Sequence, residues 1–212
     1  MIAMAQEFDA VQITTAMRRV AAALRANEGL ITELDQAVGD GDLGVTAVKL
    51  AEALDAAAGK SGAADIGRLL AETGMALNRA APSTMGTLTA TALMQAGKAA
   101  IGKNKLAVAD LSALLSAAAT AVETRGKAHV GDKTALDVLR PAADAFAAAL
   151  AAGQPLAAAA AAMIAAAREG RDRVTPLRNK IGRASWLGER TEGKVDPGCA
   201  FAVIALTAIV GG

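Results

Sequence analysis

Eight stretches of the chain repeat apolar residues at α-helical spacing, and glycine or proline separates most of them. The β-branched runs that strands favour are nearly absent, so we expect an all-α fold. Hydrophobic residues make up 53% of the chain but aromatic residues only 2%, and much of the apolar share is alanine. Alanine is small and is the strongest helix former, so the helices can pack closely. The expected helices span 8–36, 44–58, 63–80, 84–101, 107–125, 132–152, 155–172 and 197–210.

The length and the charge limit the class of protein further. A chain of 212 residues is most simply one domain, over 1–212. Its 22 basic and 21 acidic residues leave a net charge of +1, which indicates neither a nucleic-acid partner nor an anionic membrane. The single cysteine, Cys199, excludes an internal disulfide and favours the cytoplasm. The start, MIAMAQEFDA, lacks the basic residues of a signal peptide, and the longest apolar runs, 156–167 and 199–206, are shorter than the roughly 20 residues of a membrane span.

The loops divide into two chemical kinds that alternate along the chain. The loops after the second, fourth and sixth helices (AAGKSG, GKNK, AAGQP) are plain connectors. The others read VGDGDLG, RAAPSTMG, TRGKAHVGDK and TPLRNKIGRASWLGERTEGKVDP, and they hold nearly all the unusual side chains. In an up-and-down array of helices, alternate loops lie at the same end. We therefore expect the four rich loops to meet at one rim and to form a binding site.

The stretch DQAVGDGDLG crowds three carboxylates, Asp35, Asp40 and Asp42, without a basic residue among them. Glycines at 39 and 41 allow sharp turns that would aim the three side chains at one centre. Hard oxygen ligands suit Mg²⁺ or Ca²⁺, and the glutamate that closes an EF-hand loop is missing. A solvated acidic turn with a helix cap is the alternative, and spacing alone leaves the two open.

The second rich loop, APSTMGT, carries hydroxyl groups at the expected start of a helix. Ser83 or Thr84 is a natural N-cap after Pro82. Free backbone N–H groups at such a helix start bind anions, although an ordinary cap would have the same sequence.

The fourth rich loop is long and contains four glycines between 182 and 198. Arg183 offers a planar guanidinium to phosphate, and Asp196 followed by Pro197 is a start signal for the last helix. The alternative is a glycine-rich loop folded over the core, with Trp186 filling a gap.

The third rich loop, RGKAHVGDKTALD, contains a lysine at 133 that could meet phosphate or lie solvated on the surface. Its His129, as a lone histidine, fits a structural or exposed residue better than a catalytic one. The chain shows no nucleophile–base pair, no Walker A pattern and no zinc-ligand spacing, so we name no catalytic residue.

Four stretches together resemble the nucleotide-binding L subunit (DhaL) of dihydroxyacetone kinases: LDQAVGDGDLG (34–44), STMGT (83–87), GDKTALD (131–137) and GRASWLGERTEGKVDPG (182–198). The resemblance implies an all-α, eight-helix antiparallel up-and-down barrel with a nucleotide site at one rim. It also implies that Asp35, Asp40 and Asp42 hold two Mg²⁺ ions that bridge the nucleotide phosphates. The implied nucleotide-binding residues are Leu43, Gly44, Val45, Thr46, Pro82, Ser83, Thr84, Gly126, Ala135, Arg183, Asp196, Pro197 and Gly198.

The same resemblance implies a kinase subunit that transfers phosphate to dihydroxyacetone or a related ketose held on a separate K-type subunit. The donor would be ATP, or an ADP cofactor that a phosphotransferase-system protein rephosphorylates. The family usually has histidine where this chain has Leu43, and asparagine where it has Thr46. These departures favour, as an alternative function, a regulatory sensor that binds Mg-nucleotide without turnover. A plain helical adaptor with an acidic turn is a third hypothesis.

Overall fold

The computed structural model describes residues 6–59 and 65–211, and helices make up most of these ranges. In chain order the elements are β1 (Glu7–Asp9), α1 (Ala10–Ala26), α2 (Glu28–Val38), α3 (Leu43–Gly59), α4 (Ile66–Ala80), α5 (Thr84–Ala99), β2 (Lys105–Ala107), α6 (Val108–Gly126), α7 (Leu136–Ala151), α8 (Leu156–Val174), the 3₁₀ helix η1 (Arg183–Thr191) and α9 (Pro197–Val210).

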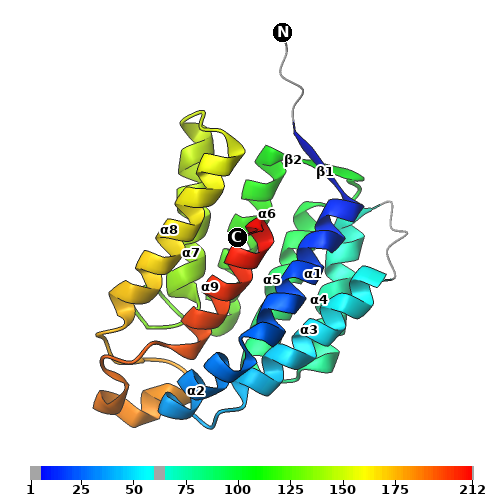
Figure 1. Ribbon diagram of the computed structural model, residues 1–212. Helices are drawn as coiled ribbons and strands as arrows, with labels where there is room; N and C mark the ends of the chain where they lie inside the picture. Colours follow the sequence, from blue (N-terminus) through cyan, green and yellow to red (C-terminus); the bar gives the residue numbers. More distant parts are fainter. Residues whose placement is uncertain (1–5, 60–64, 212) are drawn as a thin grey trace.

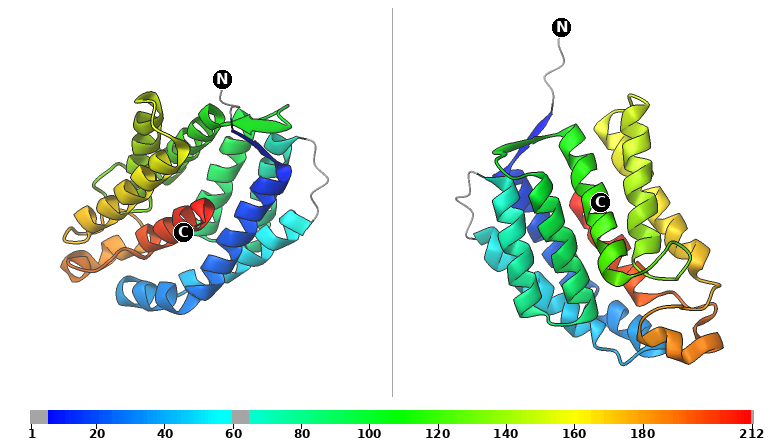
Figure 2. Two further views of the ribbon diagram at one scale, coloured as in Figure 1. Left: turned by 45° about the horizontal axis from the view of Figure 1, so that its top comes forward. Right: turned by 180° about the vertical axis from the view of Figure 1, so that it is seen from behind.

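The long helices form a closed ring. Each helix from α3 to α9 packs against the next, α1 packs against α3, and α9 returns to pack against α1 (Figures 1 and 2). The short helix α2 lies outside this ring at one end, against α3 and η1 (Figure 1). The structure therefore confirms the predicted all-α, eight-helix up-and-down barrel.

Local differences from the predicted helices have identifiable causes. The helix expected over 8–36 divides at Asn27, whose side-chain Nδ2 donates to the carbonyl oxygen of Ala23 at 2.8 Å and ends α1. Residues 7–9 pair instead with residues 105–107 in a short antiparallel ladder, β1 with β2. The first two residues of the helix expected over 63–80 lie outside the described ranges.

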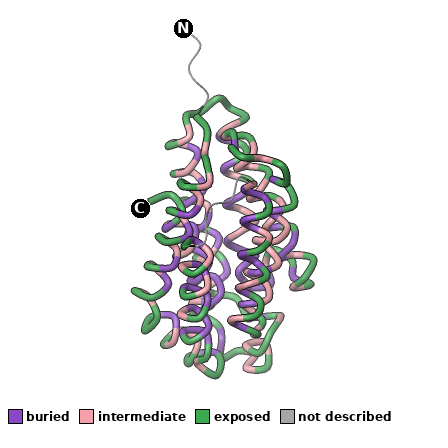
Figure 3. The backbone as a smooth tube through the Cα atoms, turned by 90° about the vertical axis from the view of Figure 1, so that its right-hand side faces the viewer, coloured by how far each residue is buried: buried purple, intermediate pink, exposed green. Residues whose placement is uncertain are grey.

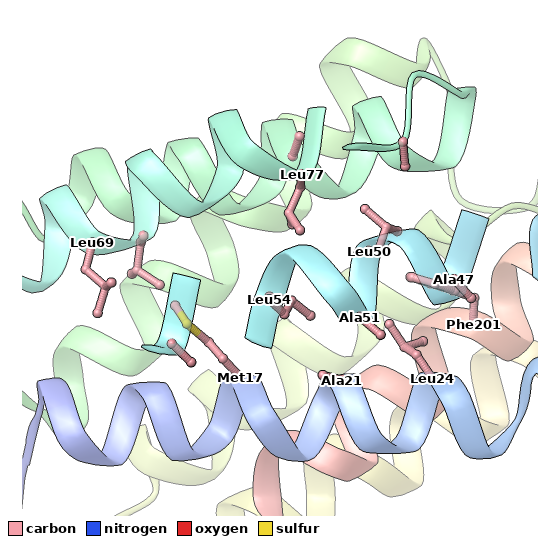
Figure 4. Packing of buried hydrophobic residues seen from close by; sticks show 14 of the residues in the cluster. Met17, Ala21, Leu24, Ala47, Leu50, Ala51, Leu54, Leu69, Leu77 and Phe201 are labelled. Atoms are coloured by element: carbon pink, nitrogen blue, oxygen red, sulfur yellow. The ribbon is translucent and has the colours of Figure 1, made fainter. Parts of the chain in front are cut away.

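Two hydrophobic clusters lie on opposite sides of the barrel. One joins α1, α3 and α4, and Phe201 of α9 reaches into it beside Leu24 and Ala47 (Figure 4). The other joins α7, α8 and α9 around Phe146 and Met163. An apolar cavity of about 750 Å³ borders both clusters. Buried residues recur along most of the long helices, and the turns between the helices are largely exposed (Figure 3).

Hydrogen bonds between loops show which loops share an end. At one end, the N–H of Ile66 donates to the carbonyl oxygen of Lys103 at 2.8 Å, near the β1–β2 ladder. At the other end, the N–H of Lys180 donates to the carbonyl oxygen of Asp132 at 3.1 Å, and Lys194 Nζ donates to that of Ala37 at 3.0 Å. The prediction that the rich loops meet at one rim is confirmed. Among the residues described, no helix is both long and apolar enough to cross a bilayer.

Candidate functional site

The three aspartates of the first rich loop converge. Asp35 lies in the last turns of α2, and Asp40 and Asp42 lie in the connection to α3. One carboxylate oxygen from each of the three lies within 4.8 Å of the others. Gly41 has a φ of 80°, in the left-handed region that glycine adopts readily, and it sits between the two exposed aspartates. The N–H of Leu43 donates to Asp35 Oδ2 at 3.0 Å, which fixes that carboxylate beside the first turn of α3.

A single arginine neutralises part of this acidic cluster. Arg183, the first residue of η1, forms an ion pair with Asp40, and its Nη1 lies 3.5 Å from Asp42 Oδ2. The side chains of Arg183, Asp40 and Asp42 are each more than half exposed, so a ligand can reach the two carboxylates and displace the guanidinium. Three converging carboxylates make an all-oxygen donor set, which suits a hard cation such as Mg²⁺. The residues therefore fit the divalent metal that the resemblance implies.

The helix starts beside the aspartates present hydroxyl groups and backbone N–H groups. Ser83 is the N-cap of α5, as predicted, and its Oγ accepts a hydrogen bond from the N–H of Gly86 at 3.1 Å. Thr46, in the first turn of α3, donates to Ser83 Oγ at 3.3 Å. This bond joins the N-termini of α3 and α5, where two helix dipoles favour an anion. Of the predicted residues here, Pro82, Thr84 and Val45 are exposed, whereas Gly44 is buried under α2.

Leu43 belongs to the barrel core. Its side chain is 7% exposed and packs in the cluster of α1, α3 and α4. The position at which the resemblance implies a histidine is therefore an apolar core position in this chain.

The third rich loop is shaped by its own carboxylates. Asp137 accepts hydrogen bonds from the N–H groups of Gly131 at 2.5 Å and Thr134 at 2.8 Å. Asp132 accepts from the N–H of His129 at 2.7 Å, while His129 itself is exposed, as expected. Burial opposes ionisation of Asp132, but this N–H bond and the ammonium of Lys180 at 3.3 Å outweigh it and lower the pKa of the carboxyl. The loop is thereby held in a compact turn before α7.

Some of the residues predicted in the third and fourth loops lie close together. Ala135 lies at the start of α7 next to Gly198, where an added Cβ would lie 3.6 Å from the backbone nitrogen of Ala135. Gly126 is the last residue of α6. The structure thus brings the starts of α7 and α9 together.

Both carboxylate oxygens of Asp196 accept hydrogen bonds from other groups of the protein. As predicted, it is the N-cap of α9: its Oδ1 accepts from the N–H of Cys199 at 2.8 Å. Its Oδ2 accepts from Asn179 Nδ2 at 2.7 Å. Burial raises the pKa of Asp196, and the two hydrogen bonds and the charge of Lys133 oppose that rise. Burial likewise raises the pKa of the Cys199 thiol, in keeping with an inert core residue.

One residue of the fourth loop and one of the third differ from the interpretation of the sequence. Trp186 is 86% exposed, so the suggestion that it fills a gap in the core is wrong. Lys133, which we considered as a phosphate-binding or solvated lysine, is instead fully buried. Periodicity could not have revealed that burial, because the partners of Lys133 lie about 40 to 60 residues further along the chain. The sequence signal that existed was only its place in the GDKTALD motif.

Comparisons with known proteins agree on one family. The model of the DAK2 domain matches residues 37–211. An Escherichia coli (strain K12) protein, "PEP-dependent dihydroxyacetone kinase, ADP-binding subunit DhaL", is 33% identical over 172 residues, covering 79% of this chain and 80% of that protein. A Listeria innocua relative, the ADP-binding subunit DhaL of a PEP-dependent dihydroxyacetone kinase 1, is 28% identical over 187 residues and covers 88% of both chains.

Solved structures give the same answer for the fold. The native dihydroxyacetone kinase of C. freundii matches 92% of this chain with a TM-score of 0.71 and 26% identity. The structure of the C. freundii enzyme in complex with AMP-PNP and Mg²⁺ matches with a TM-score of 0.68 and 25% identity. The chain spans about a third of the length of that kinase, since 33% of the kinase chain is covered.

Proposed function

Because the chain belongs to the DAK2 domain family, we propose that it is the DhaL-type nucleotide-binding subunit of a dihydroxyacetone kinase or a related ketose kinase. The observation that carries the proposal is the meeting of Asp35, Asp40 and Asp42 with Arg183 at the rim where α3 and α5 begin. Acidic side chains, an arginine and two helix N-termini in one place suit a metal-bound polyphosphate. The site opens to solvent, so nucleotide and partner can both reach it.

Each part of the rim has a proposed role. Asp35, Asp40 and Asp42 hold magnesium, two ions in the full site. The first turn of α3, 43–46, and residues 82–84 at the start of α5 hold the phosphates through backbone N–H groups and hydroxyls. Gly126 and Ala135 flank the adenine, while Arg183 and the turn 196–198 close the site.

This chain contributes binding and orientation to phosphoryl transfer. The chemistry that magnesium supplies when bound is neutralisation of charge on the nucleotide phosphates. The helix starts orient the phosphates, and the guanidinium of Arg183 turns from the aspartates to the nucleotide. No pair of side chains at the described rim is built for proton transfer, so we propose that the ketose and any general base belong to a K-type partner subunit.

The phosphate donor is the finer part of the proposal. The curated relatives are named as ADP-binding subunits of PEP- or PTS-dependent kinases. We therefore propose that this chain keeps ADP as a cofactor, which a phosphotransferase-system protein rephosphorylates, with exchangeable ATP as the second choice. Such a system operates in the cytoplasm.

Calorimetry tests the nucleotide site, and a coupled assay tests the transfer. The purified chain should bind Mg-ADP, and absence of binding at millimolar nucleotide would sink the proposal. With the K-type subunit from the same source, dihydroxyacetone phosphate should form, and Asp40→Ala should abolish its formation while the protein remains folded.

A sensor that binds Mg-nucleotide without turnover is the second candidate. The burial of Leu43 in the barrel core favours it, since no polar side chain stands at that position beside the phosphates. Nucleotide binding without transfer to any three- or four-carbon ketose would support the sensor over the kinase subunit.

A further inference from the structure

Lys133 is a charged side chain enclosed by the protein. It lies in the turn between α6 and α7, its exposed fraction is 0%, and its φ of 62° is in the left-handed region that side chains seldom adopt. Lysine is almost never fully buried without partners, because its charge loses the solvation of water. Lys133 therefore needs a specific set of partners.

Its partners are three backbone carbonyl oxygens. Lys133 Nζ donates to the oxygens of Thr175 at 2.8 Å, Leu177 at 2.7 Å and Thr191 at 2.7 Å. An ammonium group has three N–H donors, so every donor is used. Thr175 and Leu177 precede η1, and Thr191 is its last residue. One side chain thus fastens the segment 175–191 at both of its ends.

Asn179 adds a second tie between the same parts. Its Nδ2 donates to the backbone carbonyl oxygen of Lys133 at 2.8 Å, and its backbone N–H donates to Thr191 Oγ1 at 3.1 Å. Burial lowers the pKa of Lys133, and the negative charge of Asp196 opposes this effect. The nearest elements therefore hold the ammonium through three carbonyl dipoles, and the carboxylates of Asp196 and Glu192 favour its charge.

The segment that Lys133 fastens is the one that carries Arg183. Arg183 begins η1, between the two anchored ends, and reaches Asp40 and Asp42 on the opposite loop. A buried charge is an expensive way to stabilise a loop, and an apolar side chain of similar volume often serves stability as well. The three N–H donors of Lys133 add something else: they hold the backbone of Thr175, Leu177 and Thr191 in one defined position.

We propose that Lys133 is a positioning residue, which fastens the segment 175–191 so that Arg183 faces the three aspartates; this role in the site rests on the function proposed above. Lys133 itself does not touch the nucleotide. Without its ammonium, the segment is released at both ends and Arg183 loses its fixed place. Nucleotide affinity then falls, although the barrel remains closed.

The single tryptophan gives a direct probe of that segment. Trp186 lies on η1, and the chain has no tyrosine, so its fluorescence reports η1 alone. Lys133→Met keeps an unbranched side chain that is one atom shorter and removes its three donors. The matched control is Lys127→Met in the same turn, where Lys127 is exposed and has a φ of 51°.

The test compares wild type and the two variants by circular dichroism, by the fluorescence anisotropy of Trp186 and by calorimetry with Mg-ADP. We expect Lys133→Met to keep its helical spectrum, to lower the Trp186 anisotropy without nucleotide, and to weaken Mg-ADP binding about tenfold. Lys127→Met should match wild type in all three measurements. Unchanged anisotropy and a dissociation constant within twofold of wild type would overturn the proposal.

Two further outcomes are covered. If Lys133→Met does not fold, Lys133→Arg keeps the charge with different donor geometry; failure of both variants to fold overturns positioning in favour of a purely structural role. If the wild type does not bind Mg-ADP, the proposed nucleotide function fails, while the anisotropy comparison still decides whether Lys133 fixes the segment.

Discussion

Arg183 forms an ion pair with Asp40, although the two residues lie on loops at opposite ends of the chain. The guanidinium occupies the side of the aspartate cluster to which a cation would bind. Arginine and magnesium therefore compete for the same carboxylates, while arginine and a nucleotide phosphate attract each other. Removal of the arginine should thus act in opposite directions on the two ligands.

Arg183→Gln should bind free Mg²⁺ more tightly than the wild type and Mg-ADP more weakly. An exposed ion pair contributes at most about 1 kcal/mol, so the gain for Mg²⁺ alone should be about fivefold or less. Titration of Mg²⁺ with and without ADP, followed by calorimetry, measures both effects. Arg190→Gln, on the exposed side of the same helix, is the control and should change neither affinity. Equal changes in the same direction for both ligands would contradict the competition.

Asp40→Asn should weaken Mg-ADP binding by at least about tenfold, because mutation even of groups behind a metal ligand costs 10- to 100-fold. The melting temperature should change little, since Asp40 is exposed and the loss of its ion pair with Arg183 is offset by relief of repulsion from Asp35 and Asp42. Glu33→Gln, an exposed acid on α2, is the matched control. Calorimetry with Mg-ADP and thermal unfolding are measured on the wild type and the two variants. Wild-type affinity in Asp40→Asn would show that Asp40 is not a ligand of the metal.

Asp110, which lies at the end of the barrel far from the proposed site, should make the free energy of unfolding depend on pH. The carboxylate of Asp110 accepts two hydrogen bonds, one from Lys103 Nζ at 2.5 Å and one from the N–H of Ala107 at 2.9 Å. These bonds lower the pKa of Asp110 below the ordinary 3.8. The unfolded chain therefore binds the proton more readily, so this stabilisation is present above pH 3.8 and is lost as the pH falls through the lower, folded-state pKa.

Asp110→Asn should accordingly lower the free energy of unfolding at pH 7 by about 1 kcal/mol, after allowance for solvent screening of a partly exposed pair. The difference from wild type should shrink as the pH drops below 3.8. Denaturant unfolding across this range measures it. Asp144→Asn, at an exposed position of α7, should change stability by less than about 0.5 kcal/mol. A difference that is constant with pH would contradict the assignment.

Gly170→Ala should destabilise the protein by about 2 to 3 kcal/mol, because an added Cβ would collide with the backbone carbonyl oxygen of Asp137 where α8 crosses α7. A shift of Asp137 would also disturb the turn before α7, so Mg-ADP affinity should fall as well. Gly29→Ala in α2, with no atom within 4 Å of the new Cβ, should instead be neutral or stabilising by roughly 0.5 kcal/mol. Thermal unfolding of the two variants distinguishes a close helix crossing from a general effect of glycine.

The helices and the shared rim could be predicted because both follow from local patterns, whereas the closed barrel was implied by the family resemblance. Apolar spacing and glycine punctuation predicted the helices, and the alternation of loop chemistry predicted which ends meet. The caps Ser83 and Asp196 were also predictable, since capping depends on residues only three positions apart.

What the sequence did not predict depends on contacts between distant segments. The burial of Lys133 is set by carbonyl groups from a loop far along the chain, and the exposure of Trp186 depends on how that loop folds. Once the first helix divides at Asn27, the position of α2 against α3 and η1 depends on contacts that helical propensity alone cannot indicate. The short β1–β2 ladder likewise pairs residues about 100 positions apart.

The ring of helices closes through its first and last members, and this imposes an order on synthesis. Phe201 of α9 completes the cluster formed by α1, α3 and α4, so these early helices emerge from the ribosome with part of their apolar surface still uncovered. They must remain in that state until α9 has left the exit tunnel. The first half of the nascent chain is therefore the part whose apolar surface stays uncovered longest, and slow translation before α9 should lower the yield of folded protein.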